Sequence, residues 1–428
     1  MSNILKKLKG GLSLNKSFNK KKILVIGAGP LQVKTIKLIN EMGFYSLCVD
    51  GNENAPGFKY ADDYRNIDVV DKEKCLEYAL EMQIDAITTT SATITLPAVG
   101  YIAKHMNLVG ISADITDILW NKYKMKNKMV TCGLNTYGFF SDVSSPEILS
   151  RIREQIPYPS ILKPSDGSGS KGVIVVKDDS ELEDAITYSL NKSRINEIYI
   201  EEFIEGREFG VESFVCDGVI YIFSIIDKIY KFDEDGNLEY GHSLPAQLDS
   251  SDWMRMESEV KKAIECLGIN FGSVNMDLIL SREGVPYIID LGARIGLCNI
   301  AEKLIPYSTG VNILENTLKA ALGDESDFGT KLKKPISSRM LILKSGIVKS
   351  IDDYSYLYNN PYVIEIVLNI KKGDFLLGHS RRSDDFVSEF SGKTNVCGWV
   401  ITSGETIESA IETSNNVRKE LYKLITIE

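Results

Sequence analysis

The sequence predicts an α/β protein that begins with a doubly wound parallel sheet. Three observations lead to this prediction. Apolar strand-like runs alternate with helical patterns over roughly residues 21–113, which is typical of a parallel sheet. A glycine-rich hairpin then occupies residues 161–176, and an acid-tipped pair of strands covers 271–290. From residue 333 onward, short strands with Gly-Asp and Ser-Gly turns lead to a closing helix near 406–424.

The first β-α-β unit resembles a dinucleotide-binding fingerprint. A buried strand from Lys22 ends in the turn Gly27-Ala-Gly29, a helical pattern follows, and a second strand ends at Asp50. The unit departs from the fingerprint because Gln32 occupies the third glycine position. A G-x-G pattern alone is weak evidence, so nucleotide binding here is the less favoured interpretation. A further strand begins at Asp85 and precedes a helix over 97–106.

The hairpin at 161–176 has two interpretations. Its loop is rich in glycine, whose backbone N–H groups can approach a phosphate chain closely, and Lys163 and Lys171 add positive charge. This strand–loop–strand arrangement differs from the strand–loop–helix of Walker nucleotide-binding proteins. Taken alone, an ordinary hairpin with a long polar loop accounts for the pattern equally well.

The elements around this hairpin follow from apolar periodicity. We expect one lysine-rich helix over 114–133, in which Lys126 and Lys128 are solvated surface charges. The remaining expected elements are an exposed helix near 180–191, strands over 197–204 and 208–215, a polar turn at 233–237 and an amphipathic helix over 253–267.

Two acids on apolar strands, Asp277 and Asp290, predict a metal site. They lie thirteen residues apart across a hairpin, so their carboxylates can converge. A lone buried acid costs several kcal/mol unless it is paired or bound to a cation. Carboxylates together with substrate phosphates are the ligands that Mg²⁺ prefers. The alternative is that one or both acids sit in water at strand ends.

Composition limits the class of protein. At 428 residues the chain is long enough for two to four domains, and its net charge of −10 argues against a general nucleic-acid binder. Seven widely spaced cysteines without a C-x-x-C motif predict reduced, mostly buried thiols in the cytoplasm. The apolar runs are strand-sized, which predicts no membrane span. The lysine-rich segment 1–20 has no apolar core, so we expect a basic tail rather than a signal peptide.

The ordered markers resemble the ATP-grasp carboxylate–amine ligases, and most closely the biotin-carboxylase-like branch that contains bacterial L-amino acid ligases. These markers are Lys122, the Lys163 hairpin, the run Glu201–Glu208, Asp277, and Asp-x-Gly-x-Arg at 290–294. The resemblance covers the chain from Ile23 almost to the C-terminus. It implies an ATP-grasp fold with these parts: an N-terminal domain at 21–113, a two-lobed α+β ATP-grasp domain at 114–330 with a lid lobe at about 130–204, and a C-terminal α+β lobe at 331–428.

The resemblance also implies roles for particular residues. Lys122 and Lys163 would bind the ATP phosphates beneath the glycine loop, Asp277 and Asp290 would bind Mg²⁺ (with Mn²⁺ as an alternative), and Arg294 would stabilise the carboxylate and its acyl phosphate. Glu201 would hold the adenine edge with the backbone of Glu202 and Ile204, and Glu208 would hold the ribose. The implied nucleotide-binding set is completed by Gly167, Ser168, Gly169, Ser170, Lys171, Gly172 and Phe203.

One position departs from the family pattern. Many members have Glu-x-Asn-x-Arg, in which the Asn amide helps to bind a second metal, whereas this chain has Asp290 and Gly292. His242, expected in a loop, matches an acid-x-x-His pattern that in amino acid ligases lies near the substrate amine, where it would orient substrate or assist proton transfer; the alternative is a surface histidine.

Three hypotheses follow. The first is an ATP-dependent ligase that joins a small carboxylate, such as an amino acid, to an amine and releases ADP and phosphate. The second is a nucleotide-binding oxidoreductase that uses residues 23–50. The third, suggested by Gly292, is a non-catalytic ATP-grasp-like binding protein. The resemblance alone also implies a homodimer.

Overall fold

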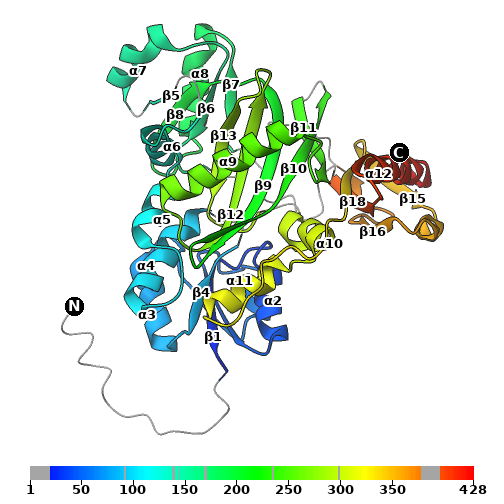
Figure 1. Ribbon diagram of the computed structural model, residues 1–428, viewed down its shortest axis with the longest axis horizontal. Coiled ribbons are helices and arrows are strands. Elements are labelled where there is room, and N and C mark those ends of the chain that lie inside the picture. Colours follow the sequence, from blue (N-terminus) through cyan, green and yellow to red (C-terminus); the bar gives the residue numbers. More distant parts are fainter. Residues whose placement is uncertain are drawn as a thin grey trace.

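The computed structural model describes residues 20–90, 93–136, 140–143, 145–167, 171–233, 236–296, 299–376 and 396–428. Nearly all of the expected basic tail, together with Ser168, Gly169 and Ser170 of the glycine loop, lies outside these residues. A lid lobe stands above a long central sheet, an N-terminal sheet lies below it, and a C-terminal lobe extends to one side (Figure 1).

The N-terminal part is the expected doubly wound parallel sheet. Its strands run in the order β3-β2-β1-β4 and all pair in parallel. They are β1 Lys22–Ile26, β2 Tyr45–Asp50, β3 Asp63–Asn66 and β4 Ala86–Thr88. The helices of this part are α2 Val33–Glu41, α3 Lys72–Met82 and α4 Leu96–Met106. Alternate β1 residues pack to opposite faces, Leu24 toward α3 and α4 and Ile23 toward α2 and the later helix α11, Ile313–Ala321.

The single helix expected over 114–133 is wrong, because the chain forms two helices there. These are α5 Ala113–Leu119 and α6 Lys122–Thr131, with Asn121 between them. The Asn121 side chain accepts a hydrogen bond from Lys124 N, which is the geometry of a helix N-cap. The new helix start puts Lys122 in the first turn, where its N–H donates to Ser165 O at 2.7 Å.

The lid lobe is a small antiparallel sheet in the order β5-β8-β6-β7. Its elements are β5 Phe140–Asp142, α7 Pro146–Ile152, β6 Ser160–Pro164, β7 Ile174–Val176, α8 Leu182–Leu190 and β8 Ile198–Glu202. The expected hairpin is confirmed, since Leu162 pairs with Ile174.

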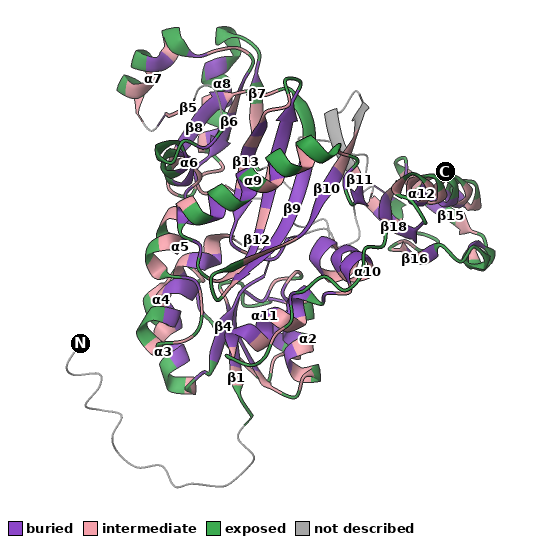
Figure 2. Ribbon diagram, in the orientation of Figure 1, coloured by how far each residue is buried: buried purple, intermediate pink, exposed green. Residues whose placement is uncertain are grey.

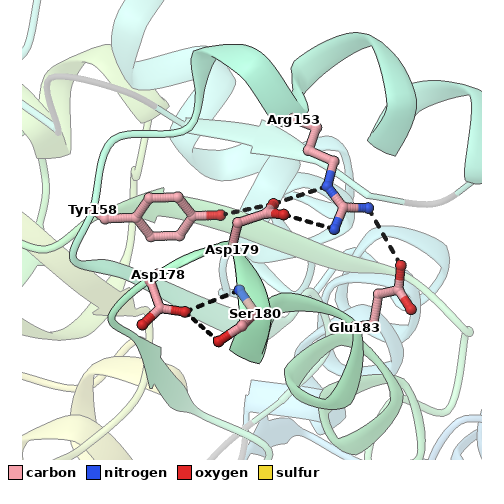
Figure 3. Close-up of polar contacts among 6 residues, drawn as sticks. All are labelled: Arg153, Tyr158, Asp178, Asp179, Ser180 and Glu183. Carbon is pink, nitrogen blue, oxygen red and sulfur yellow. Dashed lines mark hydrogen bonds and ion pairs between the residues drawn. The ribbon is translucent and has the colours of Figure 1, made fainter.

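A surface cluster braces this lobe. Arg153 binds Asp179 at 2.8 and 2.9 Å and also reaches Glu183 at 3.3 Å, while Asp178 caps the following turn at Ser180 (Figure 3). The cluster therefore fastens the start of α8 to the segment that follows α7. Exposed ion pairs of this kind contribute little stability singly, and a forked arginine adds mainly geometric definition.

A large antiparallel sheet forms the centre of the molecule. Its strands run in the order β13-β12-β9-β10-β11-β14-β18-β16. They are β9 Gly206–Cys216, β10 Val219–Asp233, β11 Gly236–Leu244, β12 Gly272–Ser281, β13 Pro286–Gly292, β14 Ile336–Ile342, β16 Val363–Leu368 and β18 Val396–Ser403. Because β11 pairs with β14, this sheet continues across the domain boundary expected at residue 330.

One face of the central sheet is apolar and covered. Helix α9, Ser250–Leu267, packs against β10 and β13, and Phe209, Met276 and Leu278 are fully buried there. Most residues of β9 and β12 are buried (Figure 2). Since side chains alternate along a strand, the residues between these apolar ones point to the opposite face.

The remaining elements follow β13 and complete the C-terminal lobe. They are a π-helical turn at Ile300–Leu304, α10 Ile305–Thr309, β15 Gly346–Ile351, β17 Phe375–Leu376, α12 Ile407–Leu424 and β19 Ile425–Ile427. Single 3₁₀ turns lie at Phe58–Tyr60, Thr93–Thr95, Arg153–Gln155, Asp179–Glu181 and Ser355–Asn359. In the described part of the chain, no helix combines the length and apolar character needed to cross a membrane.

The cysteine prediction is partly wrong. Burial raises the pKa of Cys48 and Cys75 to about 12, so these are the inert buried thiols that were expected. Cys132 and Cys266, however, form a disulfide with a Cα–Cα distance of 6.1 Å. The two lie 134 residues apart and meet because α6 packs on α9, a contact that sequence spacing does not reveal.

The disulfide predicts the number of free thiols. Labelling of the unfolded chain with iodoacetamide, counted by mass spectrometry, should modify five of the seven cysteines without reductant and all seven after reduction. Because the bridge closes a long loop, reduction should lower the free energy of unfolding by about 3–5 kcal/mol. A Cys132→Ser control should label six cysteines under both conditions; seven labels on the unreduced natural chain would contradict the bridge.

Candidate functional site

The two candidate metal-binding acids meet on the open face of the central sheet. Asp277 of β12 and Asp290 of β13 are direct cross-strand partners. Residues paired in this way point to the same face with their Cβ atoms roughly 4.5–5.5 Å apart. The expectation that these carboxylates converge is therefore confirmed.

Lys122 joins this pair from helix α6. Its Nζ atom donates a hydrogen bond to Asp290 Oδ1. Burial alone would raise the pKa of the Asp290 carboxyl, but Lys122, Lys163 and Arg294 together hold that pKa below its ordinary value. Asp290 is therefore a carboxylate at neutral pH, as a metal ligand must be.

Lys228 pairs with the other aspartate and was not predicted. It lies on β10 and its Nζ atom contacts Asp277 Oδ1 at 3.1 Å. Strand β9 lies between β10 and β12, so the lysine spans two strand spacings, roughly 10 Å. The residue beneath it on β9 is Gly210, and the atoms nearest to a Cβ there would include the Lys228 stem, at 3.9 Å. The sequence offered one sign of this, a lysine at an alternating position of a strand-like run, where an apolar residue is usual.

Glu201 is held between two lysines. The Glu201 side chain, on β8 of the lid lobe, is fully buried, and its Oε1 atom pairs with Lys163 of β6. Its Oε2 atom lies 3.9 Å from the Nζ of Lys126, which also donates to the carbonyl oxygen of Ile288 on β13.

The prediction that Lys126 is a solvated surface charge is wrong, since its side chain is 0% exposed; Lys128 is exposed as expected. Burial lowers the pKa of Lys126 to about 7, against the opposing effect of Glu201.

The other residues of the expected nucleoside-binding run lie along β8 and the start of β9. Glu202 ends β8, Phe203 is exposed, and Ile204 follows in the connection between the strands. Glu208 lies on the open face of β9, where its Oε2 atom accepts a hydrogen bond from the hydroxyl of Tyr230 at 2.5 Å. These positions are compatible with the expected roles, which stay predictions.

Arg294 lies just after β13 and begins a row of hydrogen-bonded polar side chains on the same face. Its Nη1 atom donates to Asn275 Oδ1 at 3.2 Å, and Asn275 Nδ2 donates to Glu212 Oε1 at 2.7 Å. Among the described residues, the buried Nε atom of Arg294 has no hydrogen-bond partner. The guanidinium lies close to Gly292, where a Cβ atom would be 3.2 Å from Nε.

Glu212 is a buried acid that sequence reasoning missed. Burial raises its pKa to about 8, although Arg294 and the hydrogen bonds from Asn275 and Gly296 act in the opposite direction. The Glu212 side chain is fully buried, and a Cβ atom on Gly296 would overlap its Oε1. Glycine is therefore required at 296, and Glu212 is mostly protonated at pH 7.

The glycine hairpin is shaped by close contacts at its base. Gly167 N donates to Pro164 O at 3.2 Å. Gly172 has a positive φ of 73°, and a Cβ there would lie 2.7 Å from Pro164 Cγ. Lys171 is exposed beside it. Glycine is thus required at position 172, while the phosphate-binding role of the loop stays a prediction.

The expectation that His242 lies in a loop is wrong. It lies in strand β11, is 1% exposed, and pairs with Lys228 on β10 and Ser338 on β14. Cross-strand partners share a face, so His242 lies beside Lys228 on the open side of the sheet. Its backbone oxygen accepts a hydrogen bond from Arg339 Nη1 at 3.2 Å.

The N-terminal glycine turn is filled by the protein itself. Gln32 is 6% exposed and donates to the carbonyl oxygen of Thr90, and its side chain lies against Gly27 and Gly29. The Asp50 carboxylate accepts the N–H of Ala28 at 2.8 Å. The acid that would bind a ribose in a dinucleotide fold thus holds the turn together, which argues against the oxidoreductase hypothesis.

The donor set on the open face fits a divalent cation with oxygen ligands. Two carboxylates converge, and lysines lie on both sides to offset additional negative groups. Mg²⁺ is commonly bound by one or two protein carboxylates together with substrate phosphates. Within the ranges that the structure describes, no group of three or more His, Cys, Asp or Glu side chains is placed to hold a metal.

The fold and site together define a two-lobed α+β protein in which lysines and carboxylates from both lobes form one polar cluster. Residues 121–297 match the family model described as the ATP-grasp domain. The chain thus contains an ATP-grasp domain, and the resemblance found in the sequence is confirmed.

Two solved structures share the fold. The L-amino acid ligase from Bacillus licheniformis has a TM-score of 0.75 at 22% identity, over 96% of this chain and 99% of that chain. The phosphoribosylglycinamide synthetase from Anaerococcus prevotii has a TM-score of 0.72 at 23% identity, over 95% of this chain and 99% of that chain. Similarity at this level of identity establishes the ATP-grasp fold.

Curated relatives match a smaller part of the chain. A pyruvate carboxylase subunit from Methanothermobacter thermautotrophicus is 25% identical over 72% of this chain. The chain spans 66% of that protein's length and 62% of the length of another curated relative, which is less than two thirds in each case.

Glu212 predicts a dependence of stability on pH. Its pKa is about 8 in the folded protein and about 4.5 when unfolded, so its contribution is fully present below pH 4.5 and is lost as pH rises through 8. Between these values the natural chain should lose up to about 1.4 kcal/mol of unfolding free energy per pH unit relative to Glu212→Gln. Urea unfolding of both proteins at several pH values measures this slope; parallel stability curves would contradict the assignment.

Proposed function

We propose that this protein is an ATP-dependent ligase that joins a small carboxylate to an amine through an acyl phosphate. The observation that carries the proposal is a set of lysine–carboxylate pairs, two of them at the open face of the central sheet and one in the lid lobe. Lys122 pairs with Asp290, Lys228 with Asp277, and Lys163 with Glu201. Three cations and two converging carboxylates from both lobes match the needs of a polyphosphate with its divalent metal.

Lys122 and Lys163 are the proposed ligands of the ATP phosphates. Each reaches the cluster from a rigid element, α6 and β6 respectively. Asp277 and Asp290 would hold Mg²⁺, which supplies charge neutralisation for the transferring phosphoryl group. Lys228 lies beside Asp277 and adds a third positive charge to the same space.

Arg294 is the proposed ligand of the substrate carboxylate. Its Nη1 atom is positioned by Asn275, and the Nε atom has no hydrogen-bond partner among the described residues. An arginine can bind a carboxylate or acyl phosphate through two parallel N–H groups. Placed next to Asp290, it would orient the attacking carboxylate oxygen toward the γ-phosphorus atom.

The reaction follows from these positions. A carboxylate oxygen attacks the γ-phosphorus of ATP, the bond to the β–γ bridging oxygen breaks, and ADP leaves. The amine then attacks the carbonyl carbon of the acyl phosphate, loses a proton, and displaces phosphate. Such chemistry requires charge neutralisation, positioning and exclusion of water rather than a nucleophilic side chain. The glycine hairpin is the proposed lid, and His242, on the face that carries Lys228, is the proposed residue that orients the amine or accepts its proton.

The nucleoside is proposed to lie along β8 and β9. Glu201 and the backbone of Glu202 and Ile204 would hold the adenine edge, and Glu208 would hold the ribose hydroxyls. The named enzymes of similar fold include an L-amino acid ligase, which supports an amino acid or related small acid as substrate. The cytoplasmic location and the homodimer stay predictions.

A second candidate, a binding protein without catalysis, is favoured by one observation. Where many ATP-grasp ligases have an asparagine, this chain has Gly292, and the Arg294 guanidinium lies against it. Loss of that amide removes one metal ligand. This candidate requires that ATP binds but that no combination of acid and amine releases phosphate.

Phosphate release over a matrix of acids and amines distinguishes the two candidates. For a ligase, ADP and phosphate should appear only when both substrates are present. Asp290→Asn should reduce the rate by at least about 100-fold, because even outer residues of metal sites cost 10–100-fold when replaced. Formation of AMP and pyrophosphate would rule out the acyl phosphate, and ATP binding without turnover across the matrix would favour the binding protein.

Lys163 is the residue whose removal should be most informative. Lys163→Ala is expected to abolish activity, by at least about 100-fold, because it removes a charged donor to the phosphates. The fold should remain intact, since Glu201 keeps Lys126 as a counter-ion. Lys177→Ala, an exposed lysine of the same lobe, is the matched control and should leave turnover unchanged. Normal turnover of Lys163→Ala would refute the role.

A further inference from the structure

Lys126 is a buried charge that the proposed reaction does not use. It lies one helical turn after Lys122 on α6, and its side chain is 0% exposed. Its ammonium group donates to the carbonyl oxygen of Ile288 on β13 and faces Glu201 Oε2 on β8. Burial of an ammonium group is unfavourable, because hydration is lost, unless the group is paired. Lys126 therefore connects three elements, one of them in the lid lobe. Because burial of its charge is unfavourable, we expect this connection to serve a function.

The environment of Glu201 explains why a buried lysine is needed at this position. Its carboxylate is fully buried and has one lysine at each oxygen, Lys163 at Oε1 and Lys126 at Oε2. The two lysines differ in their freedom. Lys163 is at the base of the glycine hairpin and its side chain is 9% exposed, whereas Lys126 is enclosed and anchored to Ile288. One partner can turn toward a ligand, and the other is fixed.

We propose that Lys126 is the fixed partner of Glu201, a positioning residue that holds this carboxylate in place when Lys163 binds the ATP phosphates. The proposal rests on the ATP-binding function proposed above. Without Lys126, a shift of Lys163 toward phosphate would leave the buried Glu201 carboxylate unpaired, which is unfavourable. The Glu201 carboxylate would then lose the contact that orients it toward the adenine amino group.

The test is a double-mutant cycle on ATP affinity, measured by calorimetric titration of the full chain with MgATP. The four proteins are the natural chain, Lys126→Met, Glu201→Gln, and the variant with both changes. Lys126→Met should weaken ATP binding by about tenfold or more, and the same change in the Glu201→Gln background should weaken it by less than about twofold. A purely structural role, through packing or through the bond to Ile288, would cost the same in both backgrounds. Lys128→Met, an exposed lysine on the same helix, is the matched control.

The outcomes separate this inference from the function on which it rests. If the natural chain does not bind MgATP, the proposed function fails and the inference with it. If the natural chain binds and Lys126→Met binds equally well, or if the loss persists unchanged in the Glu201→Gln background, only the inference is overturned. If Lys126→Met does not fold, thermal melting of the variant with both changes shows whether the unpaired carboxylate caused the failure. Restored folding once the unpaired carboxylate is removed supports the role of fixed partner, and failure to fold overturns it.

Discussion

The pairing of Asp277 with Asp290 is the constraint on which the site depends. Two carboxylates placed opposite each other on neighbouring strands repel, yet the register that pairs them is fixed by the other face of the sheet. Leu278 and Ile288 are paired and fully buried beneath α9, and the register shifts between this pair and the two acids, so that Asp290 faces the opposite side from Ile288 although the two are only two residues apart. Burial of the apolar face thus forces the two acids together, and the repulsion must be offset from elsewhere.

The offsetting charges come from elements that are distant in sequence. Lys122 reaches Asp290 because Asn121 caps a new helix that begins at Lys122. The backbone N–H of Lys122 also donates to the carbonyl oxygen of Ser165 at the base of the hairpin. Lys228 reaches Asp277 only by crossing β9 at Gly210. A helix cap and a missing side chain therefore decide whether the like charges are balanced. These details are small in energy, but they determine the arrangement of the whole polar face.

The sequence predicts those parts of the fold that are written in local patterns. The parallel sheet, the glycine hairpin and the acid-tipped strand pair each show strong periodicity with clear turns, and all three are confirmed. His242 was misplaced in a loop because β11 contains two glycines, Gly236 and Gly241, which weaken a strand pattern. The break at Asn121 was missed because a capping asparagine inside a helical pattern has no effect on apolar periodicity.

The burial and role of a side chain could not be predicted in the same way where they depend on partners distant in sequence. Lys126 lies four residues after Lys122, on the same helix face, and this spacing was the one available sign that it points toward the site. Its burial follows from Ile288, 162 residues away, and from Glu201. Likewise, Glu212 reads as the polar residue of an alternating strand, and only the approach of Gly296 and Asn275 encloses it.

Gly292 illustrates how such a partner changes the interpretation of a motif. In sequence it is a lost amide, one ligand fewer for a metal. In the structure it provides the space in which the Arg294 guanidinium lies, since any Cβ at 292 would be 3.2 Å from Nε. Asn275, directly opposite Gly292 on β12, accepts a hydrogen bond from that guanidinium at Oδ1 and donates one from Nδ2 to Glu212. Glycine at 292, the asparagine opposite it and the buried acid behind them therefore form one unit that sets the position of Arg294. Replacing Gly292 by the common asparagine would have to displace this arginine, so the departure from the family pattern is tied to how this chain holds its proposed carboxylate-binding residue.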